Sequence, residues 1–125
     1  MRAYLLVALG GAVGTALRFG IGRALGPWTP PAFPWATFAV NVVGCFLLGV
    51  IVEVAGDRRW AEVEVRHILG VGVMGGFTTY SSFDIELLRL GASGATPMAL
   101  GYGAATLAVC LVAGALGIVV GRAVR

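Results

Sequence analysis

The sequence predicts an all-α membrane protein with four transmembrane helices and a break in the third. Hydrophobic residues make up 58% of the 125 residues and charged residues only 12%, whereas about a quarter of an ordinary soluble domain is charged. The mean hydropathy is +0.92. Such a chain cannot cover itself with a polar surface, so we expect it to lie in the lipid bilayer of a cell membrane. Its length fits a single domain, residues 1–125.

Four apolar segments are each long enough for the helix of roughly 20 residues that crosses a bilayer. They cover residues 3–25, 34–54, 65–90 and 97–121. The first begins like a signal peptide, but its apolar character continues, so we interpret it as an uncleaved helix. The fourth begins with Pro97, a residue suited to the first turn of a helix. The connections are rich in proline, glycine or charge: GPWTPPAFP, AGDRRWAEVEVRH and GASGATP.

The charged residues lie mainly near the ends of these segments. All nine cations are arginine, and they do not cluster on a helix with interleaved aromatic residues, so we expect no binding to nucleic acid. At the segment ends they would meet lipid head groups instead. More arginines fall on the side of the two termini than on the other side, which favours termini in the cytoplasm.

The third segment contains a polar stretch, GGFTTYSSF (residues 75–83). Its glycines weaken a helix, and its hydroxyl groups compete for helical hydrogen bonds. We therefore predict a break in this helix; the alternative is an intact helix with a glycine-rich packing crossing. A break frees backbone carbonyl groups at membrane depth, which is tolerated only where they are buried in protein or bind something. Carbonyl oxygens freed in this way suit a small cation.

Polar side chains recur at helical spacing on the second and fourth segments. Thr37 and Asn41 are four residues apart and share one face, where they serve either an interhelical hydrogen bond or a functional site. Tyr102, Thr106 and Cys110 form a stripe about 12 Å long on the fourth segment. Such donors replace water around a dehydrating anion, unless they bond to the backbone of their own helix.

Other residues have both a structural and a functional interpretation. Tyr80 and Phe83 share a helical face, where aromatic rings either pack in the core or turn their positive edges toward an anion. Arg18 is the deep charge of the first segment, and it either reaches the lipid interface or attracts an anion to a pore mouth. We expect Glu86 to be exposed near a helix end, and Cys45 to be a buried small hydrophobic residue.

Several chemistries are missing from the sequence. It has no nucleotide-binding loop, no catalytic Ser/His/Asp set and no His/Cys metal cluster, so we do not expect an enzyme. The apolar cores of the first, second and fourth segments hold no carboxylate except Glu53 at one end, whereas a proton-coupled exporter usually needs an acid in mid-membrane. Hydroxyl, amide and aromatic groups without fixed negative charge suit an anion better than a cation.

Three stretches together resemble one known family over essentially the whole chain. They are GGAVGTALRF (residues 10–19), NVVGCFLLG (residues 41–49) and GGFTTYSSF (residues 75–83). Each is weak alone, but their order and spacing in a four-helix chain of this size are specific. In these features the chain resembles the small fluoride channels of the Fluc or CrcB family.

The resemblance implies a passive channel that lets fluoride leave the cell and so lowers cytoplasmic fluoride. It implies an antiparallel, dual-topology homodimer with two fluoride pathways along the subunit interface. A structural sodium ion (Na+) would lie at the dimer centre, held by the backbone carbonyl groups of Gly75 and Thr78 from both subunits. The family's pore asparagine, paired aromatics and hydroxyl stripe match the following residues, which would line the fluoride pathway: Asn41, Tyr80, Phe83, Tyr102, Thr106 and Cys110.

Two residues depart from the family's usual pattern. Tyr80 stands where phenylalanine is common, which keeps the ring edge and adds a hydroxyl; Cys110 stands where serine is common, and a thiol is a poorer donor. The uneven arginine distribution supports dual topology less than an even one would. Two alternatives stay open: a small proton-coupled four-helix exporter of dual topology, and a structural subunit that transports nothing.

Overall fold

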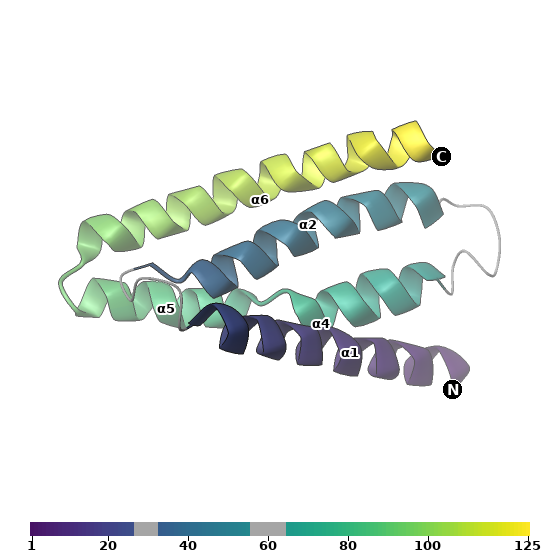
Figure 1. Ribbon diagram of the computed structural model, residues 1–125, viewed down its shortest axis with the longest axis horizontal. Coiled ribbons are helices and arrows are strands. Elements are labelled where there is room, and N and C mark those ends of the chain that lie inside the picture. Colours follow the sequence, from purple (N-terminus) through teal and green to yellow (C-terminus); the bar gives the residue numbers. More distant parts are fainter. Residues whose placement is uncertain (27–32, 56–64) are drawn as a thin grey trace.

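The computed structural model describes residues 1–26, 33–55 and 65–125, and in these ranges the chain is helical with no strand. The helices run side by side in an elongated bundle, and both chain termini lie at the same end of it (Figure 1). The elements are α1 (Arg2–Leu25), α2 (Trp35–Ala55), η2 (Arg66–Met74), α4 (Gly75–Phe77), α5 (Tyr80–Ala92) and α6 (Thr96–Val124).

Within the described ranges, α1, α2 and α6 are long and apolar enough to cross a membrane. They overlap the first, second and fourth predicted segments. Many of their large apolar side chains are exposed, among them Leu100 at 70% and Leu111 at 67%. Exposed apolar side chains of this kind suit contact with lipid. A helix is also suited to lipid because its backbone polar groups pair within the helix.

The third predicted segment is divided into η2, α4 and α5. η2 is a π-helix, a wide helical form that is rare in proteins. α4 ends at Phe77, and Thr78 (ψ 157°) and Thr79 (φ −149°) have extended backbone before α5 begins. The backbone N–H and the hydroxyl of Thr78 both donate to the Met74 carbonyl oxygen at 2.9 Å, which closes the last turn. Thr79 then caps α5, because its hydroxyl oxygen accepts from the Ser82 N–H at 3.1 Å.

The helices pair in an order that differs from their order along the chain. α1 packs on η2 and α4, whereas α2 and α5 pack on α6. Glycines allow the paired backbones to approach: a Cβ atom at Gly10 would lie 2.6 Å from the Ile68 carbonyl oxygen, and one at Gly121 would lie 2.7 Å from Glu53 Cβ. Small residues at helix contacts therefore give close packing within one chain.

The buried core is small and lies beside the extended residues. Val40, Met74 and Phe77 form its buried cluster. At the end of the bundle that holds the termini, the Glu53 carboxylate pairs with the Arg122 guanidinium (Oε1 to Nε, 3.3 Å) and links α2 to α6. The interruption between α4 and α5 lies beside the buried cluster, at the centre of the bundle and not at its end (Figure 1).

Candidate functional site

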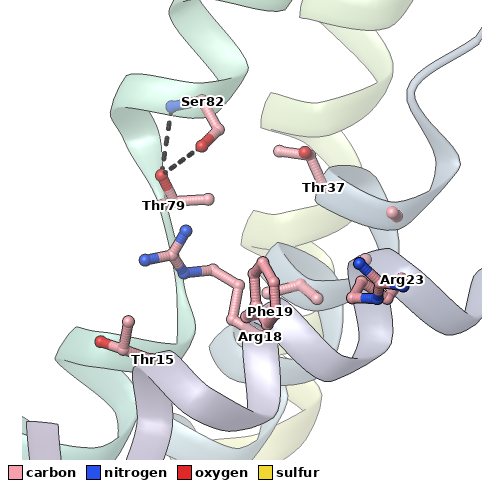
Figure 2. Close-up of a pocket in the computed structure, with 10 residues that line it drawn as sticks. Thr15, Arg18, Phe19, Arg23, Thr37, Thr79 and Ser82 are labelled. Atoms are coloured by element: carbon pink, nitrogen blue, oxygen red, sulfur yellow. Dashed lines mark hydrogen bonds between the residues drawn. The ribbon is translucent and has the colours of Figure 1, made fainter. Parts of the chain in front are cut away.

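A first pocket, which we call the arginine pocket, lies between α1, α2 and the start of α5. Its volume is about 490 Å³. Figure 2 shows Arg18 extending from α1 toward the extended residue Thr79, with Arg23 farther along α1. The lining residues are Thr15, Arg18, Phe19, Gly22, Arg23, Ala36, Thr37, Val40, Thr79 and Ser82. Two of these residues are arginines and none is acidic, so the pocket favours an anion.

Arg18 also contacts the end of α4. Its Nε donates a hydrogen bond to the Gly76 carbonyl oxygen at 3.1 Å, and the Thr15 hydroxyl approaches the same oxygen at 3.5 Å. Arg18 is half-buried and its side chain reaches into the protein. This position agrees with a place at a pore mouth, and attraction of an anion by Arg18 stays a prediction.

A second pocket, the Phe83 pocket, has a volume of about 300 Å³ and lies between α2, α5 and α6. It is lined by Asn41, Gly44, Cys45, Leu48, Thr78, Thr79, Tyr80, Phe83, Thr106, Leu107 and Cys110. Most of the residues predicted for an anion pathway therefore meet in one cavity, although they come from three helices and the segment between α4 and α5. Tyr102 is the one that does not line it.

Asn41 joins this pocket to the interruption in the third segment. Its Nδ2 donates to the Thr79 carbonyl oxygen at 3.1 Å, and its Oδ1 accepts from the Thr79 N–H at 2.8 Å. The side-chain amide thus pairs both backbone polar groups of a residue that has left the helix. One N–H and one lone pair of the amide are not used by these two bonds. Asn41 therefore has a structural role, and it keeps capacity for a ligand.

The aromatic residues form a short series beside the pocket. The ring centroids of Tyr80 and Phe83 are 5.7 Å apart, and those of Phe83 and Tyr102 are 5.1 Å apart. Tyr80 is 79% exposed in the single chain, whereas Tyr102 is fully buried. Phe83 thus lies between an exposed ring and a buried one, with tilted rings on both sides.

The predicted stripe on α6 divides into three different environments. The Tyr102 hydroxyl donates to Glu86 Oε2 at 2.8 Å. The Thr106 Oγ1 is buried, and no residue of the described ranges forms a hydrogen bond with it. Cys110 lies beside Cys45 of α2. Thr106 is therefore the member of the stripe that lines the Phe83 pocket and has a buried hydroxyl without a partner among the described residues.

A family model for the CrcB-like protein, Camphor Resistance (CrcB), matches residues 5–118 of the chain. A curated relative from Sorangium cellulosum (strain So ce56), named fluoride-specific ion channel FluC, is 45% identical over 98% of this chain and 96% of its own length. The relative of the same name from Agrobacterium fabrum is 43% identical over 94% of both chains. The chain belongs to the CrcB family. The resemblance seen in the three sequence stretches is thereby confirmed.

Membership of the CrcB family agrees with the three long apolar helices, and the chain is a multi-pass membrane protein. The relative from Pseudomonas fluorescens, again named fluoride-specific ion channel FluC, is 47% identical over 78% of this chain and 79% of its own. These names describe ion channels, in agreement with the prediction that the chain is not an enzyme.

Two expectations for this CrcB chain were wrong. Glu86 is not exposed near a helix end: it is half-buried and accepts hydrogen bonds from the hydroxyl groups of Thr37 and Tyr102, both at 2.8 Å. It thereby links α5 to α2 and α6. The signal for this role was its position three residues after Phe83, on the same helical face. Cys45 is half-buried in a pocket wall and not enclosed in the core.

The predicted sodium ligands lie at the ends of α4. Thr78 is the extended residue after α4, and Gly75 is exposed, with no atom within 4 Å of the position a Cβ would take. Apart from bonds within the helices, no residue in the described part of the chain donates a hydrogen bond to the carbonyl oxygen of either. Nor do these ranges contain three clustered His, Cys, Asp or Glu side chains. Backbone oxygens are thus the donors that this CrcB chain offers to a cation here.

Proposed function

We propose that the chain is a fluoride-specific channel that allows passive fluoride efflux and lowers cytoplasmic fluoride. The observation that carries the proposal is the Phe83 pocket of a CrcB chain, in which the buried Thr106 hydroxyl has no partner among the described residues. The relatives that cover nearly the whole chain are named for fluoride.

The chemistry of the pocket suits a small anion. Fluoride is strongly hydrated, so its entry into a membrane requires hydrogen-bond donors that replace water. The Thr106 hydroxyl and the spare N–H of Asn41 supply neutral donors, and the rings of Tyr80 and Phe83 present positively polarised edges. Neutral groups hold the anion less tightly than a buried cation would, and conduction needs an ion that can leave again.

The arginine pocket would serve as the mouth of this pathway. Arg18 and Arg23 face a cavity without an acidic lining residue, which raises the local concentration of anions. Asn41 and Thr79 connect the two pockets, since Thr79 lines both and Asn41 holds it in place. An anion attracted by Arg18 would therefore reach the neutral donors next.

We also propose that two copies of this single four-helix domain form an antiparallel, dual-topology homodimer around one sodium ion. The position of the Gly75 and Thr78 carbonyl oxygens supports this proposal, because uncharged oxygens at a helix interruption suit a small cation. The open space at Gly75 and the 79% exposure of Tyr80 support a second copy on this face. The fluoride pathways would then run along the subunit contact.

The decisive experiment is fluoride efflux from proteoliposomes, followed with a fluoride electrode and without a proton gradient. We expect fast efflux of fluoride and none of chloride. Replacement of Thr106 by valine keeps the shape and removes the donor, so efflux should fall, whereas Leu111→Val, on α6 but outside the pocket lining, should leave it unchanged. No efflux in any condition would overturn the channel function.

A proton-coupled exporter is the second candidate, because Glu86 places a carboxylate between three helices. Both of its oxygens accept from neutral hydroxyl groups, which is an arrangement that stabilises a bundle. Efflux that appears only when a proton gradient is imposed, and that is lost in Glu86→Gln, would favour the exporter.

The sodium and dimer proposals need their own measurements. Efflux should fall when N-methylglucamine replaces Na+ on both sides of the membrane, and recover when Na+ returns. The mass of the purified protein in detergent, corrected for bound detergent by light scattering, should equal that of two chains. A monomer that conducts fluoride, or efflux that is independent of Na+, would contradict the respective proposal.

A further inference from the structure

Two cysteines from different helices meet in the wall of the Phe83 pocket. Cys45 belongs to α2 and Cys110 to α6, and both are free and half-buried. Both line the pocket, and their side chains are direct neighbours. α2 and α6 are held close together at this level, since a Cβ atom at Gly114 would lie 3.7 Å from the Cys45 carbonyl oxygen.

A pair of thiols selects a particular class of metal ion. Thiolate sulfur is a soft ligand and prefers soft, thiophilic ions. Zinc needs about four ligands in a tetrahedral arrangement, and the described ranges contain no group of three His, Cys, Asp or Glu residues. An ion that binds only two sulfur ligands, in a linear arrangement, fits the pair of cysteines better.

The apolar surroundings select the charge of the ion as well. A divalent ion bound by two thiolates forms a neutral unit, whereas a monovalent ion leaves one negative charge to be buried. Burying an unpaired charge is expensive. Mercury(II), which is divalent, soft and content with two sulfur ligands, meets all of these conditions.

We propose that Cys45 and Cys110 form a two-thiolate binding site for a soft divalent metal ion of the mercury(II) type, and that the bound ion obstructs the Phe83 pocket. Two S–H bonds break and two protons leave to solvent, while two metal–sulfur bonds replace two bonds from the ion to its chloride or water ligands, so that no oxidation or reduction takes place. The obstruction follows from position, because both cysteines line the same pocket as Thr106, which lies one helical turn from Cys110.

The binding site is tested on the purified full chain, independently of ion flux. Mercuric chloride is titrated in the presence of a monothiol competitor, and bound metal is followed by thiolate–metal absorption in the ultraviolet and by intact mass. We expect one ion per chain. The competitor should remove the ion from Cys45→Ser and from Cys110→Ser at a concentration on the order of a hundredfold lower than the wild-type chain requires. This difference is expected when two ligands act together. Zinc should not bind.

Two results would overturn the site. One is two ions per chain, which means that the cysteines act separately. The other is equal retention by the wild-type chain and the single variants. If a serine variant does not fold, Cys45→Ala and Cys110→Ala supply the same comparison with a smaller and apolar side chain.

The obstruction rests on the proposed channel function, so it is measured separately as the ratio of fluoride efflux with and without metal for each variant. We expect the metal to lower fluoride efflux through the wild-type chain about tenfold or more, because an occluded pathway conducts nothing. Dithiothreitol should restore the efflux. Cys45→Ser should lose most of this block. Efflux that is unchanged while one ion is bound would overturn the obstruction, whereas an absence of efflux without metal would overturn the channel function and leave the binding result intact.

Discussion

Asn41→Ala should destabilise the folded chain by an amount set by two hydrogen bonds. The amide of Asn41 pairs the N–H and the carbonyl of Thr79 at 2.8 and 3.1 Å, and Asn41 itself is 8% exposed. Truncation leaves both backbone groups without that partner in an apolar environment. Each unpaired group costs about 1–3 kcal/mol, so the expected loss is about 2–6 kcal/mol.

The measurement is the free energy of unfolding in mixed detergent micelles, with increasing sodium dodecyl sulfate as the denaturant. Val43→Ala is the matched control, because Val43 lies on the same helix and is 47% exposed. Fluoride efflux should also fall in Asn41→Ala, but a loss of efflux alone does not separate a structural role from contact with the ion. If Asn41→Ala unfolds at the same detergent fraction as Val43→Ala, the two hydrogen bonds do not stabilise the interruption and the reasoning is refuted.

Three further predictions follow from contacts elsewhere. Gly14→Ala should destabilise the chain by about 1–3 kcal/mol in the same unfolding measurement, because the new Cβ would collide with the Val73 backbone, whereas Gly20→Ala, with open space around it, should be neutral or slightly stabilising. Glu86→Ala should destabilise the chain more than Glu86→Gln, which keeps one carbonyl acceptor for the two hydroxyl donors; equal losses would contradict this role. Arg18→Gln should slow fluoride efflux at low ionic strength, and the difference from wild type should shrink in high salt because salt screens the long-range attraction between the arginine and an approaching anion; a difference that does not depend on salt would exclude steering by charge.

The long helices could be predicted from the sequence because each is one uninterrupted apolar run. α1, α2 and α6 need no knowledge of tertiary contacts, since length and composition are sufficient. The conformation from residue 66 to residue 92 was harder to predict, because local sequence and contacts with other helices both determine it. Glycine and threonine weaken a helix, but the partners that decide where it ends come from other helices. Asn41 and Arg18, which bind the carbonyl groups of residues 79 and 76, lie far away in sequence.

The candidate site could be predicted where helical spacing alone places residues together. Thr106 and Cys110 share a face for that reason, and both line the Phe83 pocket. The partners across helices were not predictable, because spacing within one helix carries no information on the facing helix. Glu86 was misjudged on this account: its position near the end of a segment suggests exposure, whereas hydroxyl groups from α2 and α6 surround its carboxylate.

The pairing of helices has a consequence for biogenesis. α2 packs chiefly on α6, which is made after all the other described helices, and α1 packs chiefly on η2 and α4, which are made after α2. Neither of the first two helices finds its main neighbour in the next one. Thr37 and Asn41 find their hydrogen-bond partners, Glu86 and Thr79, when the third segment is made, but during synthesis the face of α2 that packs on α6 must wait uncovered in the bilayer. A chain shortened before α6 would leave this face of α2 uncovered and one Glu86 oxygen without its Tyr102 donor, and we expect quality-control proteases to remove it quickly.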